Sequence, residues 1–254
     1  MAGESTRDAR GRVTVEPCAK RVRAYLGGKP VVDSRSVLMV WEAPYYPTYY
    51  FPSVDVAAEL VSTGLTSHSP SRGEGQIFDV RTKGGEAAGA ALRYPDSPIP
   101  ELREAVRFEW GLLDEWLEED EPVYVHPRNP YHRVDILASS RHVVVEVEGV
   151  RIAESSQPRM LFETGLPVRY YLPLTAYDPD VLRPSDSESQ CPYKGTATYF
   201  HVEVGGRRHE DLVWIYRYPL PESQKVAGLA APYNERVDLV VDGERLDRPR
   251  TQFS

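Results

Sequence analysis

Residues 20–42 read KRVRAYLGGKPVVDSRSVLMVWE, and residues 141–163 read RHVVVEVEGVRIAESSQPRMLFE. Written one above the other without gaps, the two stretches place Gly28 on Gly149 and Glu42 on Glu163. Ordered self-similarity of this kind indicates an internal duplication. The chain is therefore predicted to contain two copies of a domain of about 110 residues, a common size for a single domain.

The correspondence continues along both copies. YYFP at 49–52 matches YYLP at 170–173, SPSRG at 69–73 matches CPYKG at 191–195, and YP at 94–95 matches YP at 218–219. We expect the two repeats to pack as an intramolecular pseudo-dimer. The predicted organisation is a flexible N-terminal tail at 1–19, an N-terminal repeat at 20–125, a linker at 126–140 and a C-terminal repeat at 141–254.

Each copy is predicted to consist mainly of antiparallel strands. Val143, Val145 and Val147 alternate with polar residues, which is the period of a half-buried strand. Glycine pairs and Asp-Gly steps between such runs indicate hairpin turns. Helical patterns are few, and the candidates are Val54–Ser62, Pro100–Leu117, Asp178–Leu182 and Leu220–Val226. The Pro100 segment begins with proline and acidic residues, a favourable helix start, and we expect its second half to be an inter-copy element that packs Trp110 and Trp116.

Composition excludes several classes of protein. The net charge of −8 argues against a nucleic-acid partner, which favours a basic surface. No apolar run approaches the roughly 20 residues that cross a bilayer, so no membrane association is expected. The N-terminus lacks the apolar core of a secretory signal, which predicts a cytoplasmic protein. Arginine greatly outnumbers lysine, as in many GC-rich bacteria.

Metal and cofactor chemistry is not indicated by the sequence. The two cysteines, Cys18 and Cys191, form no C-x-x-C motif, and the histidines of the linker, His126 and His132, with Asp135, match no standard ligand spacing. We therefore expect no metal and no cofactor. The acidic run that begins at Glu118 is expected to be a solvated face, and Cys18 to be incidental.

The chemistry-bearing side chains gather in the C-terminal copy. Trp214, Tyr216 and Tyr218 alternate along one strand and are expected to share one face, either as packed core or as the wall of a pocket for a flat ligand. The N-terminal copy is expected to have a degenerate site, with Ser69, Arg72, Ala90 and Leu92 at the positions of Cys191, Lys194, Trp214 and Tyr216. The candidate ligand-binding residues are Glu163, Tyr170, Cys191, Lys194, Trp214 and Tyr216.

Cys191 admits three interpretations. A free cysteine commonly behaves as a small buried hydrophobe. Alternatively, Lys194 lowers the thiol pKa from about 8.5 and makes it a nucleophile. A catalytic cysteine also needs a base, and the nearest histidine in sequence is His201. In the third interpretation, Cys191 forms a wall of the pocket while Lys194 binds a carboxylate or a phosphate.

The ordered motifs ETGLPVRYYLP, CPYKGTATY, WIYRYP and ERVDLVVDG resemble the domain of unknown function 427 family in its tandem form. The resemblance covers about Lys20 to Gly243. It implies a mainly β fold of two tandem β-tent-like (Mss4-like) domains of antiparallel sheet with few short helices. The family also carries a nucleotidyltransferase-like label. The zinc cysteines of relatives such as methionine sulfoxide reductase B and the cereblon ligand-binding domain are absent here, and a ligand site between the two sheets is implied.

Three functions stay open from the sequence. The first is a small-molecule-binding module with an aromatic pocket in the C-terminal copy. The second is an enzyme, thiol-dependent or nucleotidyltransferase-like, with Cys191, Lys194 and Glu163 as candidate catalytic residues. The third is a structural or protein-interaction module.

Overall fold

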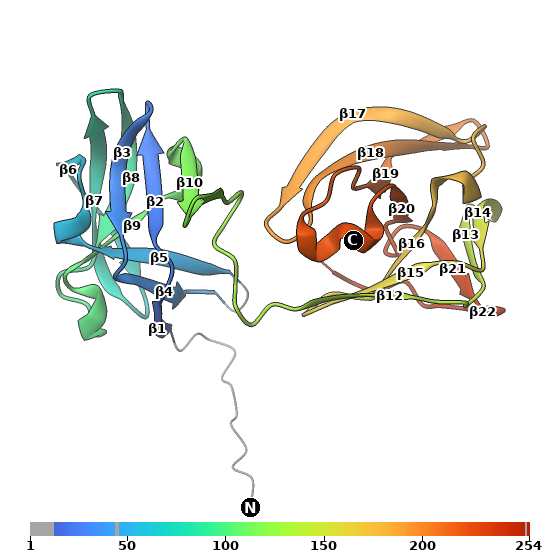
Figure 1. The fold of residues 1–254 in the computed structure, drawn as a ribbon, viewed down its shortest axis with the longest axis horizontal. Coiled ribbons are helices and arrows are strands. Elements are labelled where there is room, and N and C mark those ends of the chain that lie inside the picture. The colour runs from blue at the N-terminus through green and yellow to red at the C-terminus, as the bar shows by residue number, and fades with distance from the viewer. Residues whose placement is uncertain (1–12, 44–45, 252) are drawn as a thin grey trace, which may run out of the picture. The chain divides into compact units, whose positions relative to one another are not determined.

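The computed structural model describes residues 13–43, 46–251 and 253–254, so residues 1–12 of the expected tail lie outside it. The chain divides into two compact units, Met1–Asn129 and Pro130–Ser254. Each unit contains one seven-stranded and one four-stranded sheet, and all neighbouring strands run antiparallel (Figure 1). This confirms the predicted mainly β, tandem architecture.

In the N-terminal unit the larger sheet has the order β1-β4-β5-β9-β8-β7-β6. Its strands are β1 (Thr14–Cys18), β4 (Val37–Trp41), β5 (Pro47–Pro52), β9 (Ala105–Phe108), β8 (Gly85–Arg93), β7 (Gly73–Thr82) and β6 (Glu59–Ser69). The smaller sheet has the order β11-β10-β2-β3. It contains β11 (Glu121–Pro122), β10 (Glu115–Glu118), β2 (Val22–Leu26) and β3 (Lys29–Ser34).

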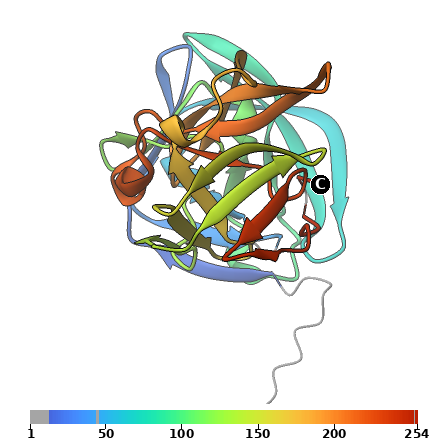
Figure 2. The same ribbon diagram turned by 90° about the vertical axis from the view of Figure 1, so that its right-hand side faces the viewer.

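The C-terminal unit repeats this topology strand for strand. Its larger sheet has the order β12-β15-β16-β20-β19-β18-β17. The strands are β12 (Val134–Ala138), β15 (Arg159–Glu163), β16 (Arg169–Pro173), β20 (Leu229–Pro232), β19 (Arg207–Ile215), β18 (Gly195–Val204) and β17 (Leu182–Cys191). The smaller sheet has the order β14-β13-β21-β22, with β14 (Val150–Ser155), β13 (Val143–Val147), β21 (Asp238–Val241) and β22 (Glu244–Arg245). Figure 2 shows β13 and β14 in yellow-green beside β21 in red.

Two strands lie where the sequence predicts a tail and a linker. β1 falls inside 1–19 and pairs with β4, while β12 falls inside 126–140 and pairs with β15. The two strands occupy the same edge of their sheets, so each repeat begins one strand earlier than the sequence comparison indicates.

The main core of the C-terminal unit lies between its two sheets. Val143, Val145 and Ile152 of the smaller sheet pack against Val213 and Ile215 of the larger one. Because successive side chains on a strand point to opposite faces, the alternate residues of the larger sheet face outward. There they build a second, smaller cluster around Tyr171, Trp214 and Tyr216. The N-terminal unit has the same two layers.

The few short helices are all 3-10 helices, and the candidate at Leu220–Val226 coincides with one of them, whereas no α-helix forms at the other candidate segments. Within the described residues the only helical segments are 3-10 turns, namely η1 (Ser53–Asp55), η2 (Pro100–Leu102), η3 (Trp110–Leu112), η4 (Leu174–Ala176) and η5 (Pro221–Val226). The segment Pro100–Leu117 folds into η2, β9, η3 and part of β10. It is not helical because Val106 and Phe108 of β9 pair with β5 and β8 in the larger sheet. Trp116 stacks on Trp110 and packs in the N-terminal unit's own core, which corrects the inter-copy interpretation. In the part of the chain that is described, no helix is both long and apolar enough to cross a bilayer.

Candidate functional site

A buried ion pair joins the end of β15 to the turn between β17 and β18. Glu163 is the last residue of β15, and Lys194 is in the CPYKG turn. The Lys194 ammonium donates to Glu163 Oε2, and the two residues are 8% and 9% exposed. Gly195 closes the turn with a φ of +93°, a conformation that favours glycine. The Lys194 carbonyl accepts from Leu220 N at 3.1 Å, which ties the turn to the segment after β19.

His132 completes this cluster from the segment before β12. Its Nε2 donates to Glu163 Oε1 at 3.0 Å, and its ring stacks on Tyr193 with centroids 4.1 Å apart. Burial acts to raise the pKa of the Glu163 carboxyl, but the bonds from His132 and Lys194 outweigh it, and this pKa lies below its usual value. Glu163 is therefore an ionised carboxylate at neutral pH.

The aromatic residues form a packed layer beside the cluster. Trp214 and Tyr216 are 7% and 5% exposed and lie on the outer face of the larger sheet. Trp214 Nε1 donates to the Tyr171 hydroxyl at 2.9 Å. Val213 and Ile215 face the main core, as the alternation predicts. The main core fills the layer between the two sheets. Trp214 and Tyr216 lie on the opposite, outer face of the larger sheet, so they do not line a site between the sheets.

Two aromatic residues lie elsewhere than the pattern predicts. Tyr218 is 91% exposed, because β19 ends at Ile215 and the alternation reaches Tyr216 but not Tyr218. Tyr170 packs in the main core on the opposite face, and its neighbour Tyr171 is the tyrosine of the outer cluster. Burial raises the pKa of Tyr171, and the charge of Glu163 acts in the same direction, which places the two groups within electrostatic range.

Cys191 is partly exposed and carries a free thiol. It pairs with Gly195 across the turn and lies within electrostatic range of Tyr171 and Tyr216. His201 binds Asp211 instead, because the backbone N–H of Asp211 donates to His201 Nδ1 at 3.1 Å. The histidine brought to the CPYKG turn is therefore His132.

The residues considered for metal binding have other partners. His132 binds Glu163, Arg133 binds Asp135 at 2.8 Å, and the ring of His126 lies edge-on to Tyr46. Among the described residues, no group of three or more histidine, cysteine, aspartate or glutamate side chains is arranged to hold a metal ion.

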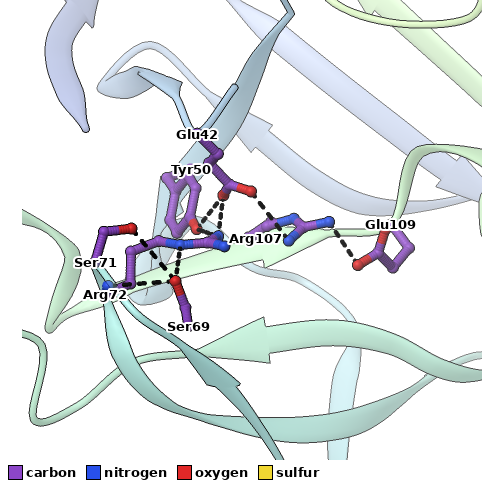
Figure 3. A network of polar contacts seen from close by, with 7 residues as sticks. All are labelled: Glu42, Tyr50, Ser69, Ser71, Arg72, Arg107 and Glu109. Carbon is purple, nitrogen blue, oxygen red and sulfur yellow. Dashed lines mark hydrogen bonds and ion pairs between the residues drawn. The ribbon is translucent and has the colours of Figure 1, made fainter. Parts of the chain in front are cut away.

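The N-terminal unit builds a related network at the matching positions (Figure 3). Glu42, at the position of Glu163, forms an ion pair with Arg72, at the position of Lys194. Arg72 Nη1 also donates to the Tyr50 hydroxyl at 3.0 Å, and Tyr50 matches Tyr171. Arg107 reaches the second carboxylate oxygen of Glu42 at 3.3 Å. The N-terminal copy therefore keeps the carboxylate–cation arrangement and exchanges lysine for arginine.

Strand register corrects the equivalences around Trp214. Tyr199 pairs with Trp214 in one unit, and Ile77 pairs with Leu92 in the other. Leu92, and not Ala90, therefore corresponds to Trp214. Two residues further on, Tyr94 corresponds to Tyr216, where the sequence comparison had placed Leu92.

Comparison with known families agrees with this two-unit structure. A family model described as "Domain of unknown function (DUF427)" matches residues 14–119 and 135–243. The chain belongs to this family. The two matched regions begin at β1 and at β12, so each DUF427 domain is one structural unit. A comparison with curated proteins gives no significant match.

The DUF427 chain contains two buried charged features that sequence reasoning missed. Glu118 is 8% exposed, accepts from the Tyr49 hydroxyl at 2.7 Å and pairs with Lys20, which corrects its assignment to a solvated face. Arg169 and Glu235 form a buried bidentate pair with N–O distances of 2.6 and 2.7 Å. No local motif marks either feature, because the paired residues are 66 or more positions apart.

Proposed function

We propose that this tandem DUF427 protein binds a small molecule through the C-terminal unit, at the cluster of Glu163, Lys194 and His132. The supporting observation is the burial of the Glu163–Lys194 pair against His132. Removing two charges from water carries a desolvation cost that apolar packing does not, so a buried ion pair is weak evidence for stability. We therefore assign the pair to recognition.

The chemistry of the cluster fits a flat polar molecule. An ammonium has three N–H donors, and Lys194 directs one of them to Glu163. The stacked His132 and Tyr193 rings add an aromatic surface beside it, and Cys191 forms a partly exposed wall. Trp214 contributes as a packed support that holds Tyr171 by a hydrogen bond.

Thermal-shift titration of the full chain with benzoate, nicotinate, adenine and AMP tests this proposal. A compound that binds only the folded state raises the melting temperature by mass action. The rise is expected to be lost in Lys194→Met, restored in part in Lys194→Arg, and unchanged in Lys83→Met, where an exposed lysine is replaced. No stabilisation by any of the four compounds, or equal stabilisation of Lys194→Met and the natural chain by adenine, which has no carboxylate or phosphate, contradicts the proposal.

The partial exposure of Cys191 favours a second candidate, a thiol-dependent enzyme. In that function His132, which stacks on Tyr193 of the turn, is the candidate base, and Lys194 is the neighbouring positive charge. Alkylation by iodoacetamide at pH 7 distinguishes the two functions. A rate for Cys191 well above that of free cysteine supports the enzyme, and a rate at or below it supports the binding module.

A further inference from the structure

The N-terminal unit places two guanidinium groups around its half-buried carboxylate Glu42, where the C-terminal unit places an ammonium and an imidazole around Glu163. Glu42 is contacted by Arg72 and by Arg107 (Figure 3). In the C-terminal unit Ala231 occupies the position of Arg107, because Ala231 pairs with Trp214 as Arg107 pairs with Leu92. The second guanidinium is thus a feature of the N-terminal unit alone.

One donor of Arg107 meets no acceptor in the part of the chain that the structure describes. The Nε of Arg107 is buried and has no acceptor among the described residues. Its Nη1 reaches Glu42 only at 3.3 Å, while its Nη2 lies 2.6 Å from Glu109. Burial and the charge of Arg72 both act to lower the pKa of Arg107, and the carboxylates of Glu42 and Glu109 outweigh them. Buried donors of this kind normally have partners.

Hydroxyl groups surround the other guanidinium. Arg72 Nε donates to Ser69 Oγ at 3.0 Å, and Ser71 Oγ lies 3.4 Å from Ser69 Oγ. The guanidinium also lies over the Tyr94 ring, 4.9 Å from its centroid, which fixes its plane. A planar guanidinium held in this way matches the geometry of a carboxylate or a phosphate.

We propose that the outer face of the N-terminal unit is an oxyanion-binding site, in which Arg72 and Arg107 hold a carboxylate or phosphate group of a ligand. Glu109 is the most exposed member of the network, with 38% of its side chain accessible. Its carboxylate occupies Arg107 in the free protein and is displaced when the ligand binds. This site is separate from the Lys194 cluster and does not depend on it.

The test is a calorimetric titration of the full chain with inorganic phosphate and, separately, with acetate, with ionic strength held constant by chloride. We expect binding that weakens at least tenfold in Arg107→Ala, a substitution that reproduces Ala231 of the other unit. Binding is expected to strengthen several-fold in Glu109→Gln, because the competing carboxylate is gone. Arg81→Gln, which removes an exposed arginine paired with Glu86, is the matched control and should bind normally.

The separate titrations with phosphate and with acetate identify the chemical class of the ligand. Binding of phosphate alone assigns a phosphoryl ligand, and binding of acetate alone assigns a carboxylate. No heat with either anion overturns the proposal, and so does binding that is the same in Arg107→Ala and the natural chain. Near-UV circular dichroism of each variant confirms that the site is compared in folded proteins.

Discussion

Replacing Glu163 by glutamine leaves the Lys194 ammonium buried without its counter-charge. Breaking a buried pair by removing one partner costs about 3–5 kcal/mol. The glutamine keeps a carbonyl oxygen that still accepts one bond, so we expect the lower end, about 3 kcal/mol. For a unit of this size each kcal/mol shifts the melting temperature by about 4 °C, which gives a fall of roughly 12 °C.

A double-mutant cycle separates the pair from the individual side chains. Lys194→Met alone leaves a buried carboxylate and should also cost about 3 kcal/mol. The variant with both changes removes both charges and should lose much less than the sum, with a coupling free energy of about 2 kcal/mol or more. Urea unfolding followed by circular dichroism measures all four proteins. Additive losses refute the reasoning, because they mean that the two charges do not stabilise each other.

The pH dependence of the free energy of unfolding is a second measurement on the same variants. The pKa of Glu163 is lowered in the folded protein, so the unfolded chain binds more protons as acid is added. The contribution of Glu163 to stability is present above its ordinary pKa of 4.5 and is lost as pH falls through the folded value. The natural chain should therefore lose more stability in this acidic window than Glu163→Gln does.

Three further substitutions and labels probe other parts of the fold. Arg169→Met should lower the free energy of unfolding by about 3–5 kcal/mol in urea, because Glu235 keeps a fully buried charge; a loss below about 1 kcal/mol, the usual value for exposed pairs, contradicts this. Gly84→Ala should lower the melting temperature, since an added Cβ lies 2.1 Å from a carbonyl oxygen in the facing β2–β3 turn; an unchanged melt contradicts that close approach. Iodoacetamide should modify Cys191 before Cys18, because burial raises the pKa of Cys18; mass spectrometry that finds Cys18 modified first contradicts this order.

The fold prediction depends on the internal repeat and on the alternation of apolar and polar residues along the strands. The offset between 20–42 and 141–163 identifies two copies, and the equivalent strands have the same order in the sheets of the two units. Prediction failed where tertiary pairing overrides local preference. The proline and acidic residues at Pro100 favour a helix start, but Val106 and Phe108 are needed to join β5 to β8.

The sequence singles out Glu163 and Lys194 but does not show which aromatic residues lie beside them. Glu163 and Lys194 were identified because both belong to matched motifs, and the structure brings them together. The sequence favours Tyr170, but Tyr171 lies in the outer cluster, because a Tyr-Tyr pair does not reveal which residue faces outward until the strand register is known. His132 could not be assigned to Glu163, because their contact depends on how β12 pairs with β15.

The most direct measurement of the central claim is calorimetry of adenine, which carries no carboxylate or phosphate for Arg72 and Arg107, with the natural chain, Lys194→Met and Arg107→Ala. Binding in the C-terminal unit predicts a dissociation constant at least tenfold weaker in Lys194→Met and unchanged in Arg107→Ala. Equal affinity for the natural chain and Lys194→Met contradicts the claim that the Glu163–Lys194–His132 cluster is the ligand site.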